Sequence, residues 1–181
     1  MLAFNVAGLM GSVPGTDRRY EITGAQLTLP GDMRLAAPLN GRVRLSRTTR
    51  SIIADAELTT SLDGHCSRCL RPVVTPIRVE LTEEALPSVD LHTGAPLDTS
   101  AEPDALRIDQ HHVLDLEGPV GDAIAMAEPI APLCSAACRG LCPVCGADLN
   151  EEPAHFHDDD PADPRLAALA AWSPPGSGAT G

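Results

Sequence analysis

Six cysteines stand out as the residues whose spacing could support chemistry. Four of them lie in PLCSAACRGLCPVCGADLN, residues 132–150, with the spacing Cys-x3-Cys-x3-Cys-x2-Cys, and a further Cys-x2-Cys pair lies in HCSRCL. A Cys-x2-Cys hairpin lets two thiolates and nearby backbone N–H groups converge on one metal ion, and a glycine after the second cysteine suits the sharp turn. Two such pairs predict a bound metal, and we expect structural zinc held tetrahedrally by four ligands.

Six cysteines exceed one tetrahedral site by two, so the ligand set stays open. The sequence favours a local set, because a local site needs no long-range closure of the chain; the alternative joins the pair in CPVCG to the pair in HCSRCL. The local set is Cys134, Cys138, Cys142 and Cys145, and the alternative combines Cys142 and Cys145 with Cys66 and Cys69. His155 and His157 could also bind a metal, but two histidines in the acidic stretch HFHDDD are more typical of a solvated segment.

Other uses of the thiols are less consistent with the pattern. Unligated core cysteines would be scattered through apolar runs, whereas these lie among Pro, Gly, Ser and Arg. A thiol-based redox protein or an iron–sulfur protein is the main alternative, although the spacing does not match ferredoxin runs. This alternative predicts visible absorbance or cycling between thiol and disulfide, whereas a zinc site predicts a colourless protein.

Catalytic motifs are mostly missing from the sequence. HExxH, GxSxG and a phosphate-binding glycine loop do not occur, and a cluster of cysteines alone usually closes a zinc site to substrate. A metal-dependent nuclease would need preorganised carboxylates, and Asp158, Asp159 and Asp160 lie in a flexible tether. We therefore expect a protein that is not an enzyme and has no small-molecule substrate.

Composition limits the class of protein. The 181 residues include only two Phe, one Tyr and one Trp, which are too few to stack a run of bases or to line a flavin pocket. No apolar run approaches the roughly 18 residues of a membrane span, and MLAFNVAGLM lacks the basic start of a signal peptide. We expect a cytoplasmic protein without a membrane partner, and clustered thiols in that compartment are more often metal ligands than disulfides.

The hydropathy pattern predicts an α+β fold. Alternation of apolar and charged residues between about 23 and 81 indicates an antiparallel β meander, either a curved sheet or an open barrel, with a turn near Arg50. A short helix is expected within residues 1–12, and apolar residues at helical spacing predict a C-terminal helix that ends before Pro129 and leads to the Cys-rich metal knuckle. The expected organisation is an Arg-rich β domain (1–86), a mobile loop (87–108), a helix plus knuckle (109–150), and an acidic tether with a short helix and a disordered tail (151–181).

The net charge of −12 is divided unevenly along the chain. Residues 1–80 hold ten Arg against seven Asp and Glu, whereas residues 81–181 hold three against eighteen. Only the Arg-rich half could meet nucleic acid, although a solvated strand face explains the pattern equally well. The candidate RNA-binding residues are Arg42, Arg44, Arg47, Arg50, Arg68 and Arg71.

The order of these motifs resembles the bacterial YceD family. The resemblance rests on CSRCLRPV, LDLEGPVGDAIAMAEPIAPLC and CRGLCPVCGADLN, followed by DPRLAAL. It implies a non-enzymatic ribosome-biogenesis factor that supports accumulation of large-subunit ribosomal RNA. The expected partners are the pre-large ribosomal subunit, its rRNA or a basic ribosomal protein. Family members often carry further cysteines after the LN segment, where this chain has EEPAHFH, so a ligand there would have to be His155 or His157.

Overall fold

The chain forms two compact units, which we call unit 1 (Met1–Cys138) and unit 2 (Arg139–Gly181). The computed structural model describes residues 2–91, 93–98, 100, 102–157, 165, 169 and 172. The short helix and tail expected near the C-terminus, and Asp158, Asp159 and Asp160, lie outside these residues apart from the three isolated positions. The boundary at residue 138 falls inside the Cys-rich stretch.

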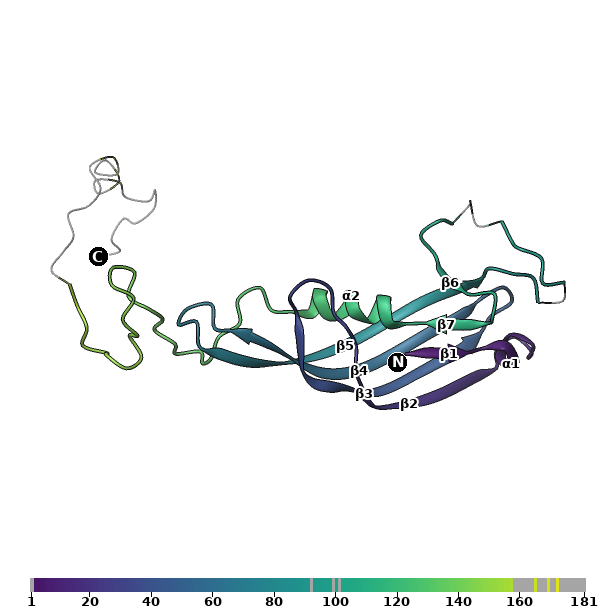
Figure 1. Ribbon diagram of the computed structural model, residues 1–181, viewed down its shortest axis with the longest axis horizontal. Helices are drawn as coiled ribbons and strands as arrows, with labels where there is room; N and C mark the ends of the chain where they lie inside the picture. Colours follow the sequence, from purple (N-terminus) through teal and green to yellow (C-terminus); the bar gives the residue numbers. More distant parts are fainter. Residues whose placement is uncertain are drawn as a thin grey trace, which may run out of the picture. The chain divides into compact units, whose positions relative to one another are not determined.

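Unit 1 is built on one sheet with the strand order β1-β7-β6-β5-β4-β3-β2 (Figure 1). The strands are β1 (Ala3–Asn5), β2 (Asp17–Ala25), β3 (Arg34–Arg47), β4 (Ile52–His65), β5 (Pro72–Pro87), β6 (Leu106–Ile108) and β7 (Val113–Asp115). Strands β2 to β5 form the expected antiparallel meander, and the predicted turn near Arg50 joins β3 to β4. The sheet as a whole is mixed, because β6 runs parallel to β5.

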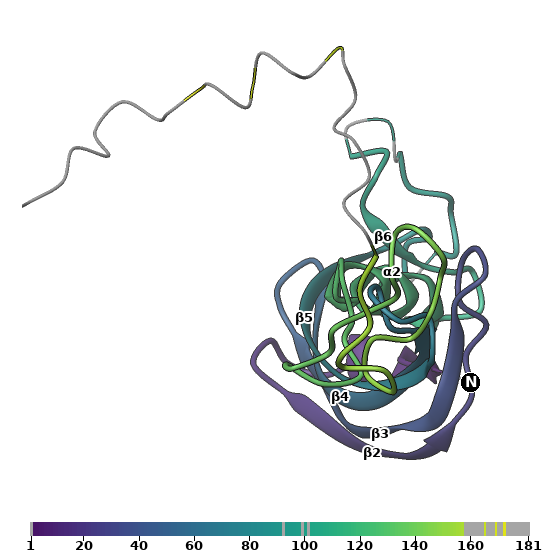
Figure 2. The ribbon, with the colours of Figure 1, turned by 90° about the vertical axis from the view of Figure 1, so that its left-hand side faces the viewer.

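Buried apolar and exposed polar residues alternate along the strands, so one face of the sheet is apolar and the other is polar. On β3, Val43 and Leu45 are buried whereas Arg42 and Arg44 are exposed, as a period of two requires. The inner face packs against helix α2 (Glu117–Ala127), and the strands curve around this helix (Figure 2). The resulting core is mostly aliphatic, with Phe4 buried in it and Tyr20 packed against it.

Gly41 lies on β3 opposite Leu58 of β4. Its φ of +148° lies outside the range that other residues prefer, and a Cβ atom here would be 2.1 Å from the carbonyl oxygen of Glu57. The register between β2 and β3 shifts just beyond this point, between Ile22 and Ala25. Gly41 therefore permits a local irregularity that only glycine can occupy without moving β4.

The N-terminal segment differs from the predicted helix over residues 1–12. Residues 3–5 form strand β1, which pairs with β7, and only Ala7–Met10 form a single helical turn, α1. The apolar residues Leu2, Val6 and Leu9 are buried as expected. The short helix expected within residues 1–12 is therefore confirmed only at Ala7–Met10, because residues 3–5 pair with a strand more than a hundred positions away.

Helix α2 follows the prediction closely. Val120 and Ile124 are buried on one side, and Glu128 adopts an extended conformation before Pro129. Within the described residues, no helix has the length and apolar character needed to cross a membrane.

The segment expected as a mobile loop, residues 87–108, contains ordered pairing. Val89 bridges Pro96, and β6 occupies the last three positions of the segment. Ala85, Leu86 and Pro87 at the end of β5 pair with β6 in parallel. A three-residue strand has too little sequence pattern to be predicted, since its conformation depends on a neighbour distant along the chain.

Candidate metal centres

The first Cys-x2-Cys pair forms a tight hairpin at the end of β4. The Cys66 N–H donates to the Arg71 carbonyl over 2.8 Å, and the Leu70 N–H donates to the Cys66 carbonyl over 2.9 Å. Leu70 has a φ of +60°, in the left-handed region, directly after Cys69. The hairpin therefore holds both thiols on one side of a fixed turn.

The second Cys-x2-Cys pair repeats this hairpin bond for bond in unit 2. The Cys142 N–H donates to the Ala147 carbonyl, and the Gly146 N–H donates to the Cys142 carbonyl, both over 2.8 Å. Gly146, directly after Cys145, has a φ of +76°. Two segments with unlike sequences, CSRCLR and CPVCGA, thus adopt the backbone geometry that presents two sulfur atoms to a metal ion.

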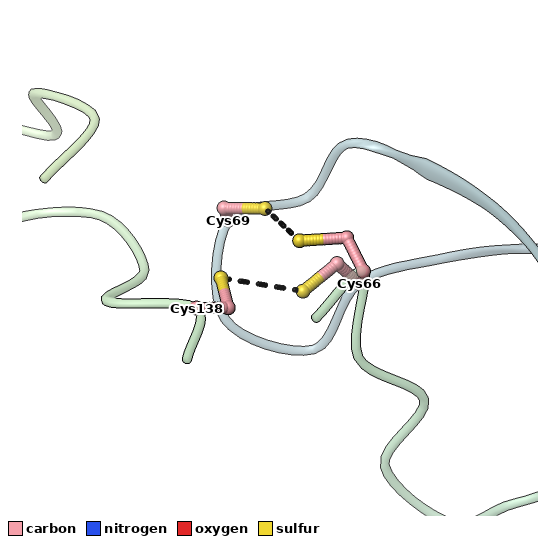
Figure 3. A group of neighbouring side chains, drawn as sticks. Cys66, Cys69 and Cys138 are labelled. Carbon is pink, nitrogen blue, oxygen red and sulfur yellow. Dashed lines mark hydrogen bonds between the residues drawn. The ribbon is translucent and has the colours of Figure 1, made fainter. Parts of the chain in front are cut away.

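Four thiols converge in unit 1 to form what we call the four-cysteine centre: Cys66, Cys69, Cys134 and Cys138. Their sulfur atoms all lie within 4.8 Å of one another, with 3.8 Å between Cys66 and Cys138 and 3.5 Å between Cys69 and Cys134. The labelled side chains point toward a common centre (Figure 3). Sulfur atoms bound to a tetrahedral zinc ion at about 2.3 Å lie about 3.8 Å apart, so the arrangement fits such an ion.

The four-cysteine centre joins two parts of unit 1. Cys66 and Cys69 come from the tip of the β4–β5 hairpin, whereas Cys134 and Cys138 follow α2. The Ser67 N–H donates to the Pro132 carbonyl over 2.8 Å. A guanidinium nitrogen of the nearby Arg68 also donates to the Cys138 carbonyl over 2.8 Å, so the contact does not depend on thiols alone.

A second group in unit 2, which we call the Cys2His2 centre, consists of Cys142, Cys145, His155 and His157. The Nε2 atoms of His155 and His157 lie 3.2 and 3.3 Å from the Cys145 sulfur, and 2.9 Å from each other. All four ligand atoms lie within 4.8 Å of one another. Cys142 is buried, whereas Cys145 and His157 are exposed.

These groupings differ from both ligand sets suggested by the sequence. All six cysteines lie in groups able to hold a metal ion, but Cys134 and Cys138 group with Cys66 and Cys69, and the remaining pair groups with two histidines. The sequence favoured a solvated segment for His155 and His157, whereas the structure brings both imidazoles beside the Cys145 sulfur. Their spacing, His-x-His within ten to twelve positions of a Cys-x2-Cys pair, is the signal that could have identified them.

Backbone donors favour one thiolate in each hairpin. The N–H groups of Cys69 and then Cys134 hydrogen-bond to the Cys66 sulfur and lower its pKa to about 6. In unit 2, the N–H groups of Cys145 and then Val144 likewise lower the pKa of Cys142 to about 6.

The neighbouring thiols act in the opposite direction on Cys134. Hydrogen bonding with Cys69 and then with Cys138 raises the pKa of Cys134 to about 12. Four thiolates this close would repel one another strongly, and a divalent cation would offset that repulsion. The electrostatics of the four-cysteine centre therefore match a site for a cation.

The candidate RNA-binding arginines engage other protein groups. Arg42 contacts Glu57 at 2.7 Å, and Arg44 lies 3.6 Å from Asp17. Arg47 donates to the carbonyls of Met10, Thr48 and Ser51.

The other candidate arginines lie in two further places. Arg50 lies 3.7 Å from Glu84 and 3.3 Å from Glu102. Arg68 and Arg71 belong to the first Cys-x2-Cys hairpin and are exposed. Of the six candidate arginines, Arg42 and Arg44 line one hollow on the sheet.

Comparison with known proteins places these features in a family. Proteins named as uncharacterized in Mycobacterium tuberculosis and Mycobacterium bovis are 32% identical to the chain over 135 residues, covering 75% of this chain and 62% of theirs. A protein so named in Mycobacterium leprae is 28% identical over 158 residues, covering 82% of this chain and 68% of its own. The match thus spans about three fifths of the length of the first two relatives. No solved structure matches the chain.

A family model provides the assignment. The model described as large ribosomal RNA subunit accumulation protein YceD matches residues 54–172. The matched region begins in β4 and includes all six cysteines and both histidines of the two centres. The chain therefore belongs to the YceD family.

Proposed function

We propose that the chain is a cytoplasmic, non-enzymatic ribosome-biogenesis factor that supports accumulation or processing of large-subunit ribosomal RNA. The observation that carries this proposal is the family match over residues 54–172. The two candidate metal centres support a structural protein, because each offers four ligands from the chain and a catalytic zinc site keeps a position open for water or substrate.

Zinc is the metal that best suits the four-cysteine centre in this proposal. Four sulfur ligands at tetrahedral spacing are typical of structural zinc, and the buried Cys66 and Cys138 limit access of solvent. Zinc here would fasten the segment after α2 to the β4–β5 hairpin. A redox or iron–sulfur role remains the alternative outcome, and an absorption spectrum with elemental analysis distinguishes the two.

A basic ribosomal protein is the partner that the charges favour over naked RNA. A hollow of about 610 Å³ on the sheet mixes both signs, since Arg19, Arg42 and Arg44 share it with Glu21, Asp55, Glu57 and Glu80. Such a surface offers a polyanion no continuous positive potential. Residues 81–181, by contrast, hold eighteen acidic against three basic residues, which suits a cationic partner.

Deletion and complementation test the proposed function. Cells lacking the chain should show a reduced ratio of large-subunit to small-subunit rRNA, and the wild-type gene should restore it. Affinity purification from the complemented cells should recover pre-large subunits or a basic ribosomal protein in a salt-sensitive manner. An unchanged rRNA ratio together with no ribosomal component in the purification would refute the proposal.

A further inference from the structure

Unit 2 lacks a hydrophobic core among its described residues. The core cluster of buried residues and the apolar residues packed against it extend from Leu2 to Ile124, and they include none of the described residues of unit 2. Within residues 139–157, only Gly140 and Cys142 are buried, whereas Val144 and Phe156 are exposed. Apolar burial therefore cannot supply the free energy that orders this segment.

Hydrogen bonds give the segment a defined backbone nonetheless. The Leu149 N–H donates to the Gly140 carbonyl over 3.0 Å, and the Arg139 N–H donates to the side-chain oxygen of Asn150 over 2.8 Å. The Glu152 N–H donates to the Asp148 carbonyl over 3.0 Å. Exposed hydrogen bonds of this kind contribute only about 1 kcal/mol each, so another interaction must fix the fold.

The Cys2His2 centre is the feature able to do so. The second Cys-x2-Cys hairpin already has the geometry of the first, and two Nε2 atoms face the Cys145 sulfur at 3.2 and 3.3 Å. Sulfur and nitrogen ligands of a tetrahedral zinc ion lie about 3.6 Å apart, close to these distances. Two cysteines and two histidines are a common ligand set for structural zinc.

A carboxylate prepares one histidine for this role. The Nδ1 atom of His155 lies 3.3 Å from a carboxylate oxygen of Glu152. A carboxylate at Nδ1 fixes the tautomer that leaves Nε2 free as a ligand, and such contacts are typical of metal-bound histidines. Glu152 is thus a positioning residue for His155.

We propose that unit 2 is a zinc-folded module, in which Cys142, Cys145, His155 and His157 bind one Zn²⁺ separate from the ion of the four-cysteine centre. Because the described residues 139–157 have no core of their own, zinc binding and folding of this segment form one equilibrium. The full chain then binds two zinc ions, and only one of them orders unit 2. This inference does not depend on the ribosomal role.

Zinc stoichiometry of the reduced full chain tests the proposal. Native mass spectrometry should show two Zn²⁺ per chain for the wild type and one for a His155→Ala, His157→Ala variant. The His111→Ala variant is the matched control, because His111 is exposed outside both centres, and it should retain two. A wild type that binds one Zn²⁺, or a double variant that still binds two, would overturn the proposal.

NMR of the same full chain gives a second, site-specific measurement. During titration with Zn²⁺, amide signals of residues 139–157 should become dispersed, and the imidazole nitrogens of His155 and His157 should show metal-bound Nε2. Glu152→Gln should weaken Zn²⁺ binding at this centre by about tenfold, whereas Glu128→Gln should not. Histidine signals that do not respond to Zn²⁺ would contradict the proposal even if the rRNA ratio confirmed the ribosomal role.

Discussion

The sulfur of Cys66 lies 3.8 Å from the sulfur of Cys138, although 72 positions separate the two residues. Cys66 ends the β4 side of a hairpin, and Cys138 closes the segment that leaves α2. A metal ion between them would act as a cross-link that holds this segment on the sheet. Such a link stabilises the native state partly by restricting the unfolded chain.

Replacement of a ligand should therefore destabilise unit 1. We expect Cys138→Ser to remove the metal of the four-cysteine centre and to lower the free energy of unfolding by roughly 3 kcal/mol. For a domain of this size the corresponding fall in melting temperature is about 6 to 12 °C. Ser135→Ala, at an exposed position in the same segment, is the control and should leave both quantities unchanged. Full metal content in Cys138→Ser would show that this thiol is not a ligand.

Gly41 predicts a second large effect, unrelated to metal. The Cβ atom of Gly41→Ala would meet the Glu57 carbonyl at 2.1 Å, so β3 and β4 must separate locally. We expect the free energy of unfolding, measured by urea denaturation, to fall by about 3 kcal/mol or more. Gly64→Ala on β4 is the matched control. The nearest atom to a Cβ atom there, the Val73 carbonyl oxygen, would be 3.9 Å away, so this substitution should change the free energy of unfolding by less than about 1 kcal/mol. Equal effects of the two substitutions would contradict this account.

The arginines should divide into structural and surface residues. Arg47→Ala removes three donors to backbone carbonyls and should cost about 2 kcal/mol. Arg42→Ala breaks an exposed pair with Glu57 and should cost less than about 1 kcal/mol. Chemical denaturation of both variants checks this order. If Arg42→Ala is harmless to folding, it can test RNA binding cleanly, and unchanged binding would favour a protein partner.

The ionisation of Cys66 predicts that the folding stability of the zinc-free protein depends on pH. Its pKa in the folded state is about 6, below the value of 9.0 for a free thiol, so folding favours its thiolate. The stabilisation is therefore fully present above about pH 9 and is lost as the pH falls toward 6. Because Cys142 also has a pKa of about 6, the rise of thiolate absorbance in the ultraviolet near pH 6 should be smaller by one group in Cys66→Ser than in the wild type. A wild-type titration with a midpoint near 9 would disprove the shift.

Local patterns predicted the elements that short-range physics determines. The meander, the turn near Arg50 and the helix ending before Pro129 were confirmed, because alternation, turn residues and proline act within a few positions. The two Cys-x2-Cys hairpins also follow their local spacing, even where Leu70 takes the left-handed position that Gly146 occupies in unit 2.

The sequence pattern could not predict which distant segments pair with each other. Strand β1 and strand β6 are three residues each, too short to show a period, and both depend on neighbours in the sheet. The grouping of the thiols was equally hard to predict, because Cys134 and Cys138 follow α2 and are distant in sequence from the first hairpin that they approach. For His155 and His157 the local spacing after CPVCG did carry a signal, but the acidic residues around them favoured a solvated segment.

The pairing of β1 with β7 also sets an order of folding. Strands β2 to β5 are joined by short connections, so their pairing closes small loops, whereas the Leu2 N–H reaches Glu117 across 115 positions. Loop-closure entropy delays contacts of such sequence separation. During synthesis the first residues must wait until β7 and α2 have emerged, and Leu2, Phe4 and Val6 stay solvent-exposed until then. A nascent chain halted before residue 113 should therefore expose these three apolar side chains and bind chaperones, whereas a chain released after α2 should not.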